Sequence, residues 1–262
     1  MKKLYYMVIY NIMEKLTSRK NEYIRHLRSL ASDREYRHAK EEFVCDGLKL
    51  LKEALCFGAE VTSVLWKERA EALGELDGAA QYIADSELFD YASPMKNSPG
   101  PLFSVKLPVQ DTVAALRNAI VLETVQDPGN VGTVIRTANA FGIDAVILTG
   151  DCADLYNPKT VRSTMGAIFR QRILEVDRAD LAGLLRRNAL PLYGAALHHD
   201  SALLTELNLK SSAVAVGSEG RGLSEELLSM CEKTVFIPMQ PDSESLNAAV
   251  AASVIMWEMA RQ

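Results

Sequence analysis

The carboxyl-terminal half of the chain contains short, continuous apolar runs separated by segments with helical periodicity. The runs are residues 119–124, 145–148, 192–196, 213–216 and 234–237. None shows the strict alternation of a half-exposed strand, so we expect each strand to be buried on both faces. Buried strands interleaved with helices predict an α/β domain with a parallel sheet covered on both faces. Because ligands of such sheets bind beyond the carboxyl ends of the strands, the loops after these runs are where we expect the chemistry.

The amino-terminal part has a different organisation. Residues 17–40 hold seven Arg or Lys against three Asp or Glu, and Ile24, Leu27 and Leu30 predict an apolar stripe on a basic helix. A solvated helix face is the ordinary interpretation of such charges. A strand at 43–44, a helix over 46–57 and a strand over 61–66 are predicted next. The proline-rich residues 93–108 read as a linker, with the domain boundary near residue 106.

Length and composition limit the class of protein. The chain has 262 residues, enough for one large or two ordinary domains, and 48% hydrophobic residues, which is typical of a globular protein. Its net charge of −5 shows no overall basic field that would indicate a nucleic-acid partner. No apolar run is long enough to predict a membrane span, and residues 1–16 read better as a poorly ordered leader, or as residues preceding a true start at Met13, than as a secretory signal.

The four cysteines are scattered, without a CxxC pair or a histidine at metal-ligand spacing. We therefore expect buried, reduced thiols in a cytoplasmic protein, with neither a zinc site nor a disulfide framework. His198 and His199, followed by Asp200, come after a predicted strand, but no further ligand residue accompanies them, so no metal site is predicted.

The first loop of interest lies in VLETVQDPGNVGTVIRTANAFG, residues 121–142. Pro128 and Gly129 break the chain after a strand, and Asn130 is expected to cap the next helix. Arg136 follows six residues later on that helix. Taken alone, Arg136 would be a surface arginine on an amphipathic helix.

Two further loops carry polar residues after buried strands. VAVGSEGRGLSEELL, residues 214–228, places Glu219 among glycines; it matches neither GxxxxGK[ST] nor GxGxxG, and the carboxylate would repel a phosphate. A hydroxyl, an amide or a cationic group suits this loop better. Ser224 begins the next helix well. In residues 235–261 a helix rich in small residues is predicted to start around Ser245, with Asn247 beside it.

The order and spacing of these three motifs resemble those of the SpoU (TrmH-like) branch of the SPOUT methyltransferases, over residues 121–261 and including NPKTVRSTMGAIFR at 157–170. Residues 17–105 are more weakly similar to the ribosomal-protein-like RNA-binding domain of many 23S rRNA ribose methyltransferases, although Cys45 and Asp46 depart from the usual Val-Glu-like pair. With the leader at 1–16 and the boundary near residue 106, the resemblance implies an α/β RNA-binding domain at 17–106 and a catalytic domain at 107–262 with a deep carboxyl-terminal trefoil knot. It also implies a homodimer with the active site near its interface.

The resemblance assigns roles residue by residue. Arg136 matches the arginine that approaches the target hydroxyl and an RNA phosphate, and we favour electrostatic stabilisation over a general base because a guanidinium stays protonated. The polar positions that would hold Arg136 and the ribose are Asn130, Glu219, Ser245 and Asn247. The positions that would bind the adenosine of S-adenosylmethionine are Ala195, Ala196, Gly217, Ile237, Met239 and Leu246.

The function so implied is transfer of a methyl group from S-adenosylmethionine to a ribose 2'-hydroxyl of RNA, with 23S-type rRNA favoured over tRNA. The candidate RNA-binding cations are Arg19, Lys20, Arg25, Arg28, Arg37 and Arg162. One alternative is a catalytically inactive RNA-binding or assembly factor on the same scaffold. A nucleotide-dependent oxidoreductase is disfavoured because the GxGxxG fingerprint and its acidic ribose reader are missing. No membrane partner is expected.

Overall fold

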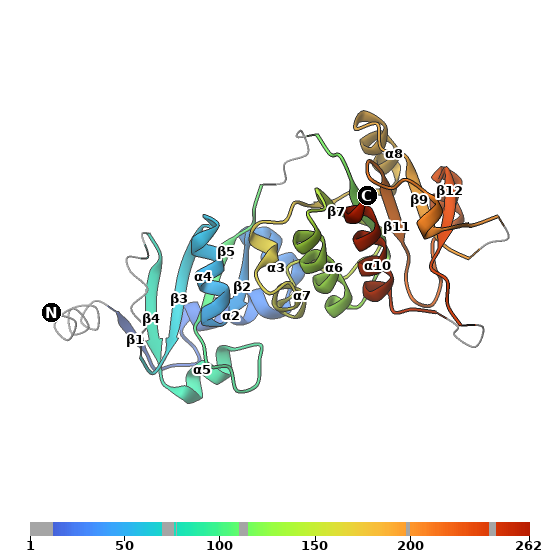
Figure 1. The fold of residues 1–262 in the computed structure, drawn as a ribbon. Helices are drawn as coiled ribbons and strands as arrows, with labels where there is room; N and C mark the ends of the chain where they lie inside the picture. Colours follow the sequence, from blue (N-terminus) through green and yellow to red (C-terminus); the bar gives the residue numbers. More distant parts are fainter. Residues whose placement is uncertain (1–12, 70–75, 77, 110–114, 198–199, 241–244) are drawn as a thin grey trace. The chain divides into compact units, whose positions relative to one another are not determined.

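The computed structural model describes residues 13–69, 76, 78–109, 115–197, 200–240 and 245–262. Contacts divide the chain into two compact units. Unit 1 comprises residues 1–108 together with 156–162, and unit 2 comprises residues 109–155 and 163–262. Residues 156–162 therefore group with the amino-terminal part, although they follow the first strands of the carboxyl-terminal part along the chain (Figure 1).

Unit 2 is built on a parallel sheet, as the buried runs predicted. Its strands, in spatial order, are β10 (Ala202–Leu203), β12 (Lys233–Phe236), β9 (Leu192–Ala195), β11 (Ala213–Val216), β6 (Ala119–Glu123), β7 (Ala145–Thr149) and β8 (Ile173–Glu175). Every neighbouring pair in this order is parallel. The edge strands β8 and β10 were not predicted, because two or three residues are too few to show a pattern.

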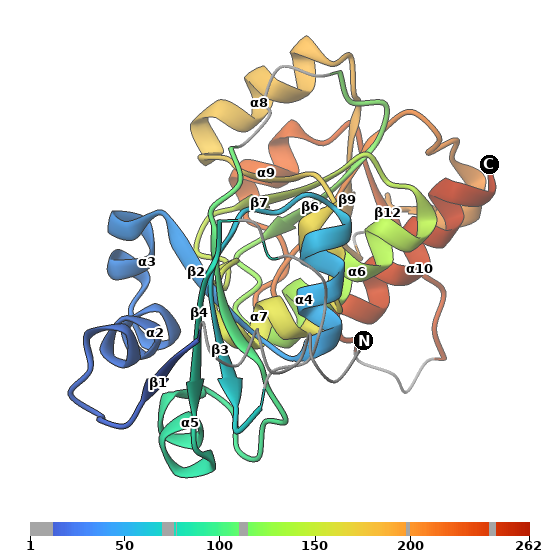
Figure 2. The same ribbon diagram turned by 90° about the vertical axis from the view of Figure 1, so that its left-hand side faces the viewer.

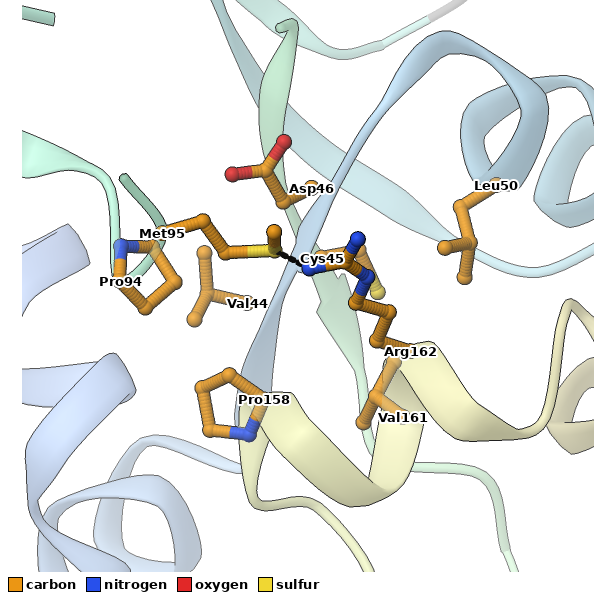
Figure 3. Close-up of a pocket in the computed structure, with 9 residues that line it drawn as sticks. All are labelled: Val44, Cys45, Asp46, Leu50, Pro94, Met95, Pro158, Val161 and Arg162. Atoms are coloured by element: carbon orange, nitrogen blue, oxygen red, sulfur yellow. Dashed lines mark hydrogen bonds between the residues drawn. The ribbon is translucent and has the colours of Figure 1, made fainter. Parts of the chain in front are cut away.

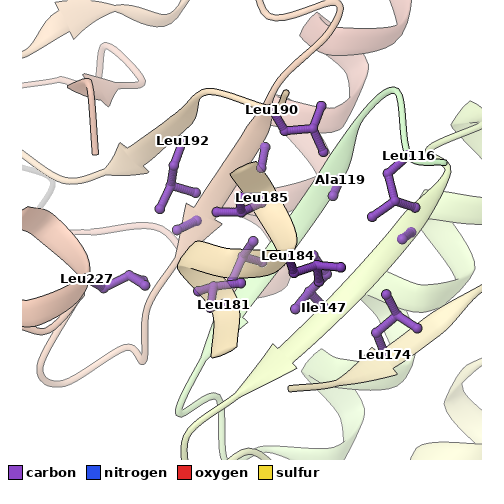
Figure 4. Packing of buried hydrophobic residues seen from close by; sticks show 14 of the residues in the cluster. Leu116, Ala119, Ile147, Leu174, Leu181, Leu184, Leu185, Leu190, Leu192 and Leu227 are labelled. Carbon is purple, nitrogen blue, oxygen red and sulfur yellow. The ribbon is translucent and has the colours of Figure 1, made fainter. Parts of the chain in front are cut away.

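Helices cover both faces of this sheet (Figure 2). On one face α6 (Pro128–Phe141) packs against α10 (Ala248–Arg261). On the other face lie α8 (Arg178–Arg187) and α9 (Glu225–Met230). Ala119 and Val121 of β6 join the apolar cluster under α8 and α9, which Figure 4 shows, while Ile120 and Leu122 are equally buried on the opposite side. The continuous apolar character of β6 follows from this two-sided burial.

Unit 1 contains a mixed sheet. Its strands, in spatial order, are β1 (Glu14–Leu16), β4 (Ala80–Ala84), β3 (Val61–Lys67), β5 (Leu102–Lys106) and β2 (Glu42–Asp46). β5 runs antiparallel to both β3 and β2, whereas β1, β4 and β3 are mutually parallel. The core on one face brings α2 (Glu22–Ser32) and α5 (Ser86–Ala92) together, and the helices α3 (Arg34–Lys40) and α4 (Leu48–Cys56) complete the unit.

Three expectations for unit 1 need correction. The basic helix is two helices, because the Asp33 side chain accepts a hydrogen bond from Tyr36 N and caps a new helix start. The proline-rich stretch is not only a linker, because its last residues form β5, an interior strand whose apolar Leu102 and Phe103 are fully buried. The expected leader includes β1, since Glu14–Leu16 pairs with β4 and buries Leu16; residues 1–12 lie outside the described residues.

The segment 156–162 packs within unit 1 beside β2 (Figure 3). The Tyr156 ring lies 5.0 Å from that of Phe43, and Arg162 Nη1 lies 3.0 Å from the thioether sulfur of Met95. Pro158 and Val161 line the same small hollow, together with Val44, Cys45, Asp46, Leu50 and Pro94.

Asp46 is a charged group in this apolar hollow. Its carboxylate accepts hydrogen bonds from the hydroxyls of Ser98 and Ser93, the latter at 2.9 Å. Burial raises the pKa of Asp46, an effect that outweighs these hydrogen bonds and the positive charges of Arg162 and Lys67. Because the pKa is higher in the folded than in the unfolded chain, the contribution of Asp46 to the stability of unit 1 is greatest below its unfolded value of about 3.9. This contribution is lost as the pH rises through the raised pKa.

The first prediction is that Asp46→Asn removes this loss of stability. As the pH rises from about 4 to about 7, the free energy of unfolding of Asp46→Asn should change in favour of the variant relative to the parent, because only the parent has to ionise a buried carboxyl group. Trp66 is buried in unit 1, so its fluorescence in a Trp257→Phe background reports urea unfolding of this unit. Glu87→Gln, on an exposed side chain of the same unit, should leave the pH profile unchanged. Parallel profiles for parent and Asp46→Asn would contradict the burial argument.

Candidate active site

The carboxyl ends of β6, β11, β9 and β12 meet at one edge of the unit 2 sheet. The parallel register aligns Ala215 with Val121 and Gly194, and Val235 with Ala195. The loops that leave these strands therefore begin side by side. All three motifs selected from the sequence lie on these loops.

Three polar side chains from three of these loops form a hydrogen-bonded cluster. The Asn130 amide donates to Glu219 Oε1. The Asn247 amide donates to Asn130 Oδ1 at 3.1 Å and lies 3.5 Å from Glu219 Oε1. The structure thus brings together residues separated by 89 and 28 positions in the chain. Glu219 keeps a carboxylate oxygen that can accept a hydrogen bond from a hydroxyl of a bound molecule.

Two of the three residues are oriented by helix starts. Asn247 caps α10, since its Oδ1 accepts hydrogen bonds from the backbone of Ala249 and Val250. α10 therefore begins at Ala248 and not around Ser245. Asn130 is not the cap of α6, contrary to expectation. Asp127 is the cap: it accepts from Asn130 N at 2.9 Å, and Pro128 occupies the first turn, where its missing N–H costs nothing.

Gly217 follows β11, and the next residues fold back over it. Ser218 and Gly222 form an antiparallel bridge, with Gly222 N donating to Ser218 O at 2.9 Å. A Cβ at position 217 would lie 2.1 Å from both the carbonyl carbon and the carbonyl oxygen of Gly222. Only glycine fits, so the sequence GSEGRG makes a tight turn that presents Glu219 at its tip.

Three of the expected adenosine-binding residues, Ala195, Ala196 and Ile237, lie at this edge together with Gly217. Ala195 ends β9, Ala196 N donates to Val235 O at 3.1 Å, and Ile237 directly follows β12. Met239 is exposed and Leu246 is half-buried next to the start of α10. Backbone groups and apolar side chains of this kind suit a flat aromatic ring.

The remaining expected catalytic residues are accessible. Arg136 is exposed on α6, six residues or about 9 Å along the helix axis from Asn130. Ser245 is exposed two residues before the Asn247 cap, and the described contacts do not join it to the cluster. The structure thus assembles Asn130, Glu219 and Asn247, and leaves Arg136 and Ser245 available to a substrate.

Most of the predicted RNA-binding cations of unit 1 are exposed on α2 and in the residues just before it. Arg19 and Arg28 both lie over the Tyr91 ring, at 4.7 and 4.1 Å from its centroid. Arg19 also pairs with Glu87, and Arg28 donates to Tyr91 O. Lys20 and Arg25 extend into solvent. The contribution of Tyr91 was not predicted, because an aromatic residue on a distant helix gives no sequence signal.

Arg37 does not belong to this surface. Its side chain is only 3% exposed and donates to Leu30 O at 2.6 Å, satisfying a carbonyl near the end of α2. The prediction that Arg37 contacts RNA is therefore wrong. Arg162 is exposed, but its guanidinium is held against Met95 within unit 1.

Metal ligands and thiols give no further site. Within the described part of the chain, no group of three His, Cys, Asp or Glu side chains is arranged to hold a metal ion, and His198 and His199 lie outside it. The four cysteines are free thiols. Of the four, Cys45 is buried, Cys152 and Cys231 are half-buried and Cys56 is exposed, which corrects the expectation that all would be buried. No helix among the described residues is long and apolar enough to cross a membrane.

The second prediction concerns the turn over Gly217. Gly217→Ala should displace the turn, because its methyl group overlaps backbone atoms that cannot move independently, at a cost of about 1–3 kcal/mol. Isothermal titration should then show loss of S-adenosylmethionine binding. Gly220→Ala, in the same loop with no atom within 4 Å of its added Cβ, is the matched control and should bind normally. Equal binding by both variants would disprove the role of the turn.

The comparisons with known proteins agree with this geometry. Residues 117–257 match the model of the SpoU rRNA Methylase family. The chain is 30% identical over 248 residues to the Bacillus subtilis 23S rRNA (guanosine(2553)-2'-O)-methyltransferase RlmP, covering 94% of this chain and 99% of that one.

Solved structures show the same fold. The SpoU methyltransferase AviRb from Streptomyces viridochromogenes, in complex with the cofactor AdoMet, matches with a TM-score of 0.82 and 27% identity, covering 92% of this chain and 98% of that one. A putative RNA methyltransferase of the TrmH family from Porphyromonas gingivalis matches with a TM-score of 0.81 and 31% identity, covering 94% and 98%. The strand-edge cluster and these matches together show that the chain belongs to the SpoU rRNA methylase family.

Proposed function

We propose that this protein transfers a methyl group from S-adenosylmethionine to a ribose 2'-hydroxyl of rRNA, of the 23S type. The observation that carries the proposal is the Asn130–Glu219–Asn247 cluster, assembled from three loops beside the glycine turn at the strand edge. The match with RlmP extends over nearly the full length of both chains, so it includes unit 1 as well as unit 2. This coverage favours rRNA over the alternative, tRNA.

The residues present fit S-adenosylmethionine. The backbone after β9, β11 and β12 can contact the adenosine, beside the small side chain of Ala195 and the apolar side chain of Ile237. Bound there, the cofactor supplies an electrophilic methyl group. Glu219 and the two asparagines can orient hydroxyl groups by accepting or donating hydrogen bonds. Holding the reactants in line is worth about 7–11 kcal/mol in favourable cases.

Arg136 is assigned to the substrate. Its exposed guanidinium can bind the phosphate next to the target ribose and stabilise the negative charge that develops on the 2'-oxygen as this oxygen attacks the methyl group and its proton passes to solvent. A guanidinium remains protonated at neutral pH, so electrostatic stabilisation accounts better for its role than proton abstraction does. A catalytically inactive RNA-binding factor is the second alternative, and the assembled polar cluster argues against it.

The proposal also includes a trefoil knot, a homodimer and a cytoplasmic location. The carboxyl-terminal trefoil knot is part of the proposal through the family resemblance, and α10, which follows β12 along the chain, packs on α6 and β11. A homodimer is supported by an apolar stripe on α10, where Val250, Val254 and Trp257 are 49%, 38% and 57% exposed. These residues recur every three or four positions, so they form one face of the helix. The four free thiols are in keeping with a cytoplasmic location.

The third prediction tests the chemistry. Arg136→Ala should abolish methyl transfer to rRNA while S-adenosylmethionine still binds, because Arg136 acts on the substrate and not on the cofactor. Transfer is measured with radiolabelled cofactor and 2'-O-methyl mapping, and binding by isothermal titration. Arg186→Ala, an exposed arginine on α8, serves as the control for charge and should retain activity. An active Arg136→Ala enzyme would remove Arg136 from the mechanism.

The fourth prediction tests the RNA-binding surface. The double variant Lys20→Glu/Arg25→Glu should raise the KM for RNA about tenfold or more, with kcat nearly unchanged, because phosphate contacts contribute to affinity and not to chemistry. The slope of log affinity against log salt should fall by about 2. Lys49→Glu on α4 is the control, and an equal effect there would indicate a general charge effect and not a surface at α2.

A further inference from the structure

A buried carboxylate lies at the end of β6, immediately before the first motif. Glu123 is 1% exposed, although it directly precedes the loop that leads to Asn130. Its carboxylate accepts hydrogen bonds from Ser224 N at 2.8 Å and from Ser224 Oγ at 2.7 Å. Burial of a carboxylate costs free energy unless the group is paired and hydrogen-bonded, so loss of these hydrogen bonds would destabilise the folded chain.

Ser224 ends the glycine turn that presents Glu219. It follows Gly222 and Leu223, the backbone of which lies directly over Gly217. Holding Ser224 in place therefore holds the carboxyl-terminal end of this turn, while β11 holds its amino-terminal end. Glu123 ties that turn to β6, and with it Glu219 is held where Asn130 can donate to it.

Ser224 also links Glu123 to α9, the helix that packs on β9 next to an expected cofactor contact. The same hydroxyl that donates to Glu123 accepts from Leu227 N at 3.2 Å and caps α9. α9 packs closely on β9: a Cβ on Gly194 would lie 3.0 Å from Cys231 Sγ and 3.5 Å from Leu228 Cδ2. Ala195, an expected cofactor contact, is the next residue of β9.

Arg178 balances the charge. Its Nε lies 3.1 Å from Glu123 Oε1, and its Nη2 donates to Thr124 Oγ1 at 3.1 Å. Thr124 has a left-handed backbone, with φ of 55°, where β6 turns into the motif loop. The arginine thus holds both the carboxylate and the first residue after the strand.

We propose that Glu123 is a positioning residue for methyl transfer. Through Ser224 it fixes the position of the turn that carries Glu219, and also the position of α9, which packs on β9 beside the expected cofactor contact Ala195. Glu123 touches neither substrate nor cofactor and acts through these two elements. The inference rests on the proposed function, because its effect is measured on S-adenosylmethionine binding and on methyl transfer.

The fifth prediction uses Glu123→Gln, which keeps the size of the side chain and removes its charge. The Kd for S-adenosylmethionine should rise about tenfold or more, since hydrogen bonds accepted by a charged carboxylate are stronger than those accepted by a neutral amide. The kcat should fall as well, because Glu219 moves with the turn. Ser224→Ala should show the same pattern, whereas Ser224→Thr should keep the Kd within about threefold of the parent value. In the double variant Glu123→Gln/Ser224→Ala, the loss of binding free energy should be smaller than the sum of the losses in the two single variants.

Glu258→Gln is the matched control. Glu258 is another buried carboxylate of unit 2, 5% exposed, and pairs with Arg261 at 2.5 Å. It lies 11 residues, or about 16 Å of helix, from the Asn247 cap. Both variants are compared by isothermal titration at a temperature where circular dichroism shows them folded. The inference is overturned if Glu123→Gln binds S-adenosylmethionine as Glu258→Gln does, or if Ser224→Thr behaves as Ser224→Ala. Failure of the parent enzyme itself to bind S-adenosylmethionine would instead refute the proposed function.

Discussion

Parallel pairing of β6, β11, β9 and β12 is the constraint on which the site depends. Parallel strands bring all their carboxyl ends to one edge, so residues far apart in the chain meet there without any direct sequence connection. The hydrogen-bonded register of these strands decides which residue leaves the sheet first. A shift of one residue in β11 would move Gly217 out from under the turn and reverse the faces of its neighbours.

The sequence was informative where burial determines the pattern. Continuous apolar runs predicted the interior strands of unit 2 and their parallel pairing, since only two-sided burial requires such runs. It was less informative where a single polar residue resets the chain. Asp33 ends one helix and caps the next, which changes the helical phase and turns Arg37 from the expected solvent face to the interior. Short-range sequence patterns do not reveal such a break between two helices.

The candidate site shows the same division. The motif loops and their polar residues were identified by resemblance, and Asn130, Glu219 and Asn247 do come together. The residues that orient them were not identified as such. Asp127 could have been found from the Asp-Pro pair at a helix start, whereas the role of Glu123 depends on a partner 101 positions away. Long-range pairs between a buried carboxylate and a loop hydroxyl leave no local signal.

The segment 156–162 has a consequence for how this protein can be divided. It lies between β7 and the short strand β8 of unit 2, but its Tyr156 and Val161 complete the packing of unit 1. The polypeptide therefore crosses from one unit to the other three times and not once. A fragment cut after residue 108 would lack part of its own interior, and the complementary fragment would carry Tyr156 and Val161 without the unit 1 residues that they pack against. The two units consequently cannot be separated by a single cut in the chain. Exchange of segments at the proline-rich stretch alone would not transfer either unit intact.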